Sequence, residues 1–133
     1  MSLVHVSPLL CRALQADALV SGAAGLLMLL ANEPLSTLLG LPQALLLGAG
    51  LAMLPWCAAL LWSARRDFLP RPAVWVVIAV NAAWVLDSLL LLVSGWVQPT
   101  PLGLAYVIAQ ALAVVVFAEL QFFGLRRSPA AMA

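Results

Sequence analysis

Nine side chains that can ionise, donate or accept hydrogen bonds interrupt long apolar stretches of this 133-residue chain. By position they form two groups: Arg12, Gln15, Asp17, Glu119 and Gln121 in the first, and Asn81, Trp84, Asp87 and Gln110 in the second. An ionisable group at membrane depth costs about 2.5–3.5 kcal/mol on insertion scales, so each such group indicates a partner or a function. The first group is a candidate polar cluster, and the second is a candidate ligand or proton site.

Residue types that carry most enzymatic chemistry are scarce. His5 is the only histidine, which excludes a haem held by two intramembrane histidines and argues against a His-based metal site. Cys11 and Cys57 form no C-x-x-C motif, so thiol–disulfide exchange lacks its usual pair. The sequence also contains no G-x-S-x-G, H-E-x-x-H or P-loop motif. We therefore expect a protein that is not an enzyme and that uses no cofactor or metal.

The composition places these side chains on membrane helices. Hydrophobic residues make up 65% of the chain and charged residues 8%, whereas soluble domains are about 25% charged. Four membrane helices of about 20 residues each would account for most of the length. A net charge of +1 offers no basic surface for nucleic acid. We predict an all-α, polytopic transmembrane bundle of four helices with short loops, in one domain over residues 1–133, with the lipid bilayer as its partner.

Charged residues, prolines and glycines divide the chain into four spans, at about 9–31, 42–62, 73–93 and 102–123. A short interfacial helix over 35–39 is expected after the first span, ended by Gly40. Pro55 predicts a kink in the second span. A polar loop over 63–72 follows, and the tail from residue 124 is expected to fray.

The distribution of arginine predicts the orientation. All six cationic residues are arginines, at the start of the first span, between the second and third, and after the fourth. Loops rich in positive charge face the cytoplasm, so both termini are predicted to be cytoplasmic. The lysine-free, Ala- and Leu-rich composition is typical of a GC-rich bacterial genome, which suggests the bacterial inner membrane.

The first group lies in one leaflet of the membrane. At 1.5 Å per residue, Arg12 lies about 5 Å and Asp17 about 12 Å from the cytoplasmic edge, and Glu119 lies about 6 Å from the same edge. This arrangement predicts that Arg12 bridges a carboxylate. Two interpretations remain open: a structural clamp between the first and last helices, and a proton or ligand site.

The second group lies between mid-bilayer and the outer edge. Asn81 and Gln110 fall near mid-bilayer, where their amides could satisfy each other. Asp87 lies about 9 Å from the outer edge, with no Arg or His at its depth. Asp87 is therefore either neutral and hydrogen-bonded, for example to Gln43, or it lines a wet cavity. Trp84 adjoins Asp87, one helical turn away.

Small residues at helical spacing predict where helices approach closely. Such pairs occur at Ser21 and Gly25 in the first span, at Gly48 and Ala52 in the second, and along 105–113 in the fourth. We expect these faces to pack against neighbouring helices.

Three segments carry a resemblance to known proteins: residues 16–22 (ADALVSG), 81–87 (NAAWVLD) and 118–127 (AELQFFGLRR). Through these segments the chain resembles a family of small, uncharacterised bacterial four-helix inner-membrane proteins. The resemblance covers nearly all of the chain. It implies a fold and a location, and no activity.

Two functions compete on this basis. The first is a non-enzymatic helical-bundle subunit or scaffold that packs with other membrane proteins or with itself as a homo-oligomer. The second is a proton-linked small-molecule transporter or a hydrophobic-ligand binder that uses Asp17, Asp87 and Glu119. An enzyme acting on lipid or quinone has the least support. A cavity between the spans that is lined by these carboxylates favours the second function, and a dry core favours the first.

The predicted orientation can be tested by cysteine-accessibility labelling of single-cysteine variants at Ser36, Gln98 and Ser128. We expect an impermeant reagent to label positions 36 and 98 from outside the cell, because both lie in loops without arginine. Position 128 should be labelled only after the membrane is permeabilised. Labelling of position 128 from outside would show that the orientation is wrong.

Overall fold

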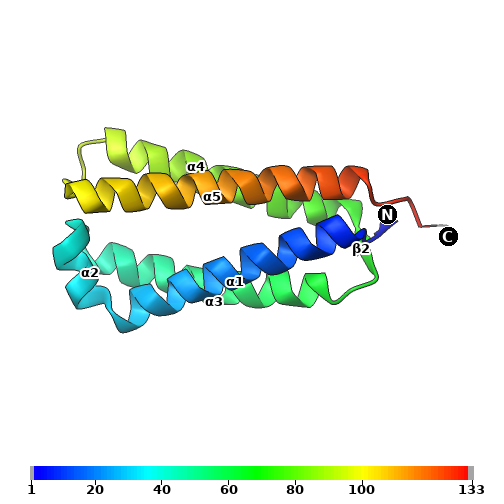
Figure 1. The fold of residues 1–133 in the computed structure, drawn as a ribbon, viewed down its shortest axis with the longest axis horizontal. Coiled ribbons are helices and arrows are strands. Elements are labelled where there is room, and N and C mark those ends of the chain that lie inside the picture. The colour runs from blue at the N-terminus through cyan, green and yellow to red at the C-terminus, as the bar shows by residue number, and fades with distance from the viewer. Residues whose placement is uncertain (1, 132–133) are drawn as a thin grey trace.

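The computed structural model describes residues 2–131, which are mostly helical (Figure 1). The long helices are α1 (Pro8–Leu30), α3 (Gln43–Ala64), α4 (Arg71–Val93) and α5 (Pro101–Arg126). The short elements are helix α2 (Asn32–Leu39) and strands β1 (Leu3–His5) and β2 (Phe68–Pro70). Within these residues, the four long helices are each long and apolar enough to cross a membrane. The prediction of a helical fold with four helices that could span a membrane, judged by length and composition, is confirmed.

Local sequence signals account for the helix ends. Ser7 caps α1 by accepting a hydrogen bond from the Leu10 N–H at 3.2 Å, and Thr100 caps α5 by accepting one from the Gly103 N–H at 3.1 Å. A proline follows each cap, at the helix start where its missing N–H is not needed. Gly40 ends α2 with φ of 68°, as predicted, although α2 begins at residue 32 rather than 35.

The long helices associate as two pairs. Helix α1 packs along α3, and α4 packs along α5, while α1 and α5 join the pairs. Helices α3 and α4 make little contact with each other. Figure 1 shows the pairs converging at the end that carries both termini, whereas α2 lies between them at the other end. We refer to these as the terminus end and the α2 end.

Glycines allow α1 and α3 to approach closely. A Cβ atom on Gly50 would lie 2.9 Å from the backbone oxygen of Gly25, and one on Gly25 would lie 3.2 Å from that of Gly50. The predicted contact face at Gly25 is therefore present. Gly48 was predicted to be a packing residue as well, but a Cβ atom there would meet nothing within 4 Å. The helix contact of α3 is made by Gly50 instead, on a different face of the helix.

Strands tie both termini to the loop between α3 and α4. Strand β1 pairs antiparallel with β2, and Val4 also bridges to Ala130 in the tail. The N–H of His5 donates to the Pro129 carbonyl at 2.8 Å, and that of Ala131 donates to the Leu3 carbonyl at 2.9 Å. The expectation that the tail frays is therefore wrong for the described residues, because the first strand holds it.

All six arginines lie at the terminus end, where α1 and α4 begin and α3 and α5 end. Aromatic rings accompany them: the Arg66 guanidinium lies 5.0 Å from the centre of the Trp62 ring, and that of Arg126 lies 5.9 Å from the Phe122 ring. Charged and aromatic groups gathered in this way are typical of one membrane interface. The side of the membrane that this end faces stays a prediction.

Two glycines of α3 provide a matched test of the α1–α3 contact. Gly50→Ala should lower the unfolding free energy by about 1–3 kcal/mol, because its methyl group overlaps the backbone of α1. Gly48→Ala should raise it by up to about 1 kcal/mol, because the methyl group meets no neighbour and alanine favours helix. Denaturant unfolding in detergent measures both. Equal effects of the two substitutions would contradict this packing.

Candidate functional site

Three polar side chains from three helices meet inside the bundle: Asp17 of α1, Asn81 of α4 and Gln121 of α5. Their exposed fractions are 1%, 3% and 0%. The Asn81 Nδ2 atom donates to Asp17 Oδ2 and to Gln121 Oε1, both at 2.9 Å. The Gln121 Nε2 atom donates to Asp17 Oδ2 at 2.8 Å, and the hydroxyl of Ser21 donates to Asp17 Oδ1 at 3.1 Å. We call these four residues the polar cluster.

Helix geometry explains how the polar cluster assembles. Ser21 follows Asp17 by four residues, so both side chains lie on one face of α1. Long side chains on a helix point toward its N-terminus, which lets Gln121 reach back along α5 to Asn81. No buried side-chain nitrogen or oxygen within residues 2–131 lacks a hydrogen-bond partner. A fully satisfied network of this kind specifies one arrangement of the helices that share it.

The other members of the first group lie elsewhere. Arg12, Gln15 and Glu119 are exposed on the helix surfaces. Arg12 precedes Asp17 by five residues, which places the two side chains about 140° apart around α1. Glu119 precedes Gln121 by two residues, which places these side chains about 160° apart around α5. Within residues 2–131 the expected Arg12 bridge therefore does not form, since Asp17 receives Ser21, Asn81 and Gln121 instead. The residues of the first group therefore lie in one membrane leaflet but not on the same helix faces.

The second group forms its own hydrogen bonds nearer the α2 end. Trp84 Nε1–H donates to Gln110 Oε1 at 2.7 Å. Gln110 Nε2 donates to Ser88 Oγ at 3.0 Å and to the Val107 carbonyl at 2.9 Å, and the Ser88 hydroxyl donates to the Trp84 carbonyl at 2.7 Å. The predicted bond between Asn81 and Gln110 is therefore wrong. Asn81 faces the polar cluster, and Gln110 lies about three turns before Gln121 on α5.

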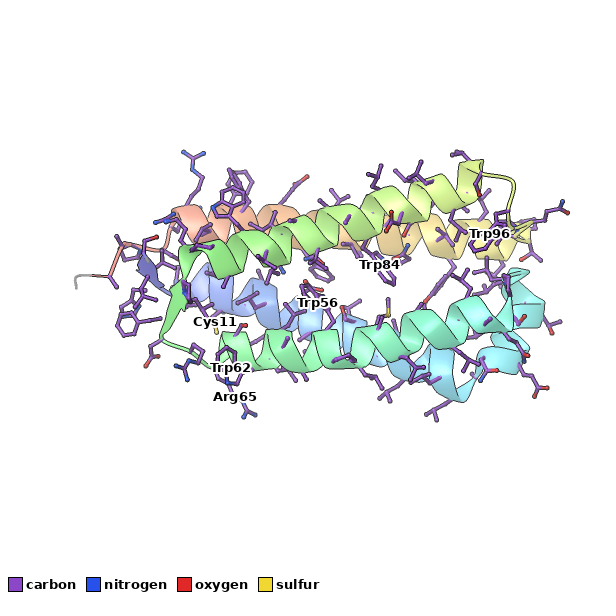
Figure 2. The ribbon with its side chains drawn as sticks, turned by 180° about the vertical axis from the view of Figure 1, so that it is seen from behind. Cys11, Trp56, Trp62, Arg65, Trp84 and Trp96 are labelled. Atoms are coloured by element: carbon purple, nitrogen blue, oxygen red, sulfur yellow. The ribbon has the colours of Figure 1, made fainter. Side chains whose placement is uncertain are left out.

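A cavity of about 490 Å³ opens between α3 and α4 toward the α2 end; we call it the α3–α4 cavity. Its wall consists mostly of aliphatic side chains, which come from α1, α3, α4 and α5. The polar and aromatic lining residues are Trp84, Asp87, Ser88, Trp96, Tyr106 and Gln110. Figure 2 shows Trp84 of α4 and Trp56 of α3 in the space between the two helices, with Trp96 at the α2 end.

A second cavity, of about 150 Å³, lies next to the first. Both cavities are lined by Ala52 and Trp84, so they adjoin at these residues. The smaller cavity is also lined by Ser21 and Asn81, which belong to the polar cluster. The indole of Trp84 therefore lies at the boundary between the large apolar cavity and the polar cluster.

Asp87 is exposed on α4 and, among the described residues, is the only charged one that lines the α3–α4 cavity. It takes no hydrogen bond from any side chain or backbone group within residues 2–131. Gln43, its suggested partner, donates instead to Asn32 Oδ1 at 3.3 Å. Of the two environments considered from the sequence, the structure places Asp87 in the cavity wall.

Sequence reasoning did not assign Ser21 or Ser88 to a site. Each follows a site residue by four positions, which is the spacing that brings side chains onto one helix face. This spacing is the signal that could have identified them. Within residues 2–131, no three His, Cys, Asp or Glu side chains gather in a way that could hold a metal ion.

The chain matches no family model, no curated protein and no solved structure.

Removal of Asn81 tests the polar cluster. Asn81→Leu should lower the unfolding free energy by about 1–3 kcal/mol, because Asp17 and Gln121 each lose a partner while buried. Arg12→Ala and Glu119→Gln are the controls, and each should change it by no more than about 0.5 kcal/mol because both side chains are exposed. Denaturant unfolding in detergent compares the three variants. A larger loss for Arg12→Ala than for Asn81→Leu would contradict the observed arrangement.

Proposed function

We propose that this small multi-pass membrane protein binds a small, mainly apolar molecule in the α3–α4 cavity and does no chemistry on it. The observation that carries the proposal is the cavity itself, which has a carboxylate in its wall. Its volume of about 490 Å³ is within the usual range of small-molecule pockets, about 300–1,000 Å³. An apolar wall with a few convergent polar groups is also typical of such pockets.

The extent of the cavity supports a small molecule over a packed protein helix. Along α3 its lining runs from Ala44 to Ala52, or about 12 Å at 1.5 Å per residue. A partner helix would need a groove along the hydrocarbon thickness of about 30 Å. Toward the terminus end, Leu60 of α3 and Val74 of α4 are buried in one shared apolar core. The space that could receive an occupant is therefore confined to the α2 half.

Two features keep the space open. Helix α2 packs against both α3 and α5 and separates the helix pairs at the α2 end. The Thr100 N–H at the start of α5 donates to the Leu39 carbonyl of α2 at 3.0 Å, which fixes this spacing. A Cβ atom on Gly103 would overlap the same carbonyl, so the close approach of α5 to α2 requires glycine at this position. With the arginine-rich end toward the cytoplasm of a bacterium, the cavity would lie in the outer leaflet of the inner membrane.

Photoaffinity labelling tests the proposal. The protein is reconstituted in phosphatidylglycerol nanodiscs, whose lipid carries no amine or ammonium group, with a decanol analogue that bears a diazirine, and the labelled residues are mapped by mass spectrometry. We expect saturable labelling concentrated on residues that line the α3–α4 cavity, because these surround a preformed apolar space. Ala52→Phe should remove most of it, because the added ring fills the space where the two cavities adjoin.

Ala58→Phe is the matched control, since Ala58 is an exposed residue of the same helix that lines neither cavity. It should leave the labelling pattern unchanged, and denaturant unfolding checks that both variants fold. Labelling that is spread evenly over the lipid-facing residues and unaffected by Ala52→Phe would contradict the proposed function.

A further inference from the structure

We infer that the molecule bound in the α3–α4 cavity carries a cationic amine or quaternary ammonium group, which Asp87 holds beside the ring of Trp84. This inference rests on the proposed function and adds the chemical class of the ligand. It follows from three features of the wall: its charge, its aromatic rings and the engagement of the donors of Trp84, Ser88 and Gln110 within the protein.

Charge is the first feature. Among residues 2–131, Asp87 and Glu33 are the only charged residues in the α2 half, and both are acidic. All six arginines lie at the opposite end, so no basic side chain is placed to neutralise Asp87. A carboxylate within a membrane span is stable only with a compensating partner or water. A cationic ligand supplies that partner, whereas an anionic ligand would add a second uncompensated charge.

The aromatic rings are the second feature. Trp84 precedes Asp87 by three residues, so both side chains lie on adjacent parts of one face of α4. The hydrogen bond from Trp84 Nε1–H to Gln110 Oε1 lies along the ring edge and holds the indole in position. Trp96 and Tyr106 line the same cavity. Aromatic faces attract cations, tryptophan most strongly, and quaternary ammonium groups are bound in proteins by this means.

The third feature is how the donors of the wall are used. Gln110 Nε2 directs its two hydrogens to Ser88 Oγ and the Val107 carbonyl, and the Trp84 N–H and the Ser88 hydroxyl also bond within the protein. These donors are occupied, so they offer nothing to a carboxylate or phosphate on a ligand. The Asp87 oxygens remain as acceptors. Around Asp87, Trp84, Ser88 and Gln110 the wall is therefore complementary to a group that is positive or that donates hydrogen bonds.

Competition against the diazirine–decanol label tests the ligand class with three probes of equal chain length: decyltrimethylammonium, decanol and decanoate. Concentrations in the nanodisc are measured, so that partition into lipid is corrected. In the wild-type protein we expect decyltrimethylammonium to displace the label at a concentration about tenfold lower than decanol, with decanoate the weakest. In Asp87→Asn, this preference for the cation should fall to about twofold to fivefold, the part that the aromatic rings supply, while displacement by decanol stays unchanged.

Glu119→Gln removes an exposed carboxylate at the other end of the molecule and should keep the full preference. Equal competition by the three probes in the wild-type protein, or a cation preference that Asp87→Asn leaves undiminished, would overturn this inference and leave the proposed function standing. A wild-type protein whose cavity residues take up no saturable label would overturn the proposed function, and this inference with it.

Discussion

The hydrogen bonds among Asp17, Asn81 and Gln121 determine how the two helix pairs are joined. Apolar contacts alone orient membrane helices weakly, because lipid tails are as apolar as the side chains that the helices would bury. A buried carboxylate and two amides can satisfy one another only when α1, α4 and α5 adopt one relative rotation and depth. The polar cluster therefore fixes the α4–α5 pair on α1. Helix α3 takes no part in it and is held chiefly by its close contact with α1, at Gly25 and Gly50.

The open space between α3 and α4 follows from the fact that the polar cluster joins α1, α4 and α5 but not α3. Because α4 is fixed to α1 and α5 rather than to α3, the two helices can diverge toward the α2 end, where α2 separates the pairs. At the terminus end the strands bring the α3–α4 loop, the first residues and the tail together and close the bundle. The molecule is thus closed at the arginine-rich end and open along one side of the other half. Trp84 lies between the open cavity and the polar cluster.

Much of this arrangement was predictable, and the rest was not, for identifiable reasons. The spans were predicted to within a few residues because hydropathy and proline or glycine positions mark them directly. Asp17, Gln121 and Asn81 were selected because polar groups at depth are costly, but their pairing was missed. Depth follows from residue counting, whereas rotation about the helix axis is set by tertiary contacts, so Arg12 and Glu119 were placed on the wrong faces. The paired strands escaped notice because three residues carry no periodicity that could be recognised.

Solid-state NMR can measure the polar cluster directly in a lipid bilayer. The measurement is the dipolar coupling between the side-chain carboxyl carbon of Asp17, labelled with ¹³C, and the amide nitrogens of Asn81 and Gln121, labelled with ¹⁵N. Hydrogen bonds of 2.9 and 2.8 Å to Oδ2 place both nitrogens within about 4 Å of that carbon. The account therefore predicts a strong coupling to each nitrogen, both with and without a ligand in the cavity. The absence of coupling to either nitrogen would contradict the central claim that this cluster joins the helix pairs.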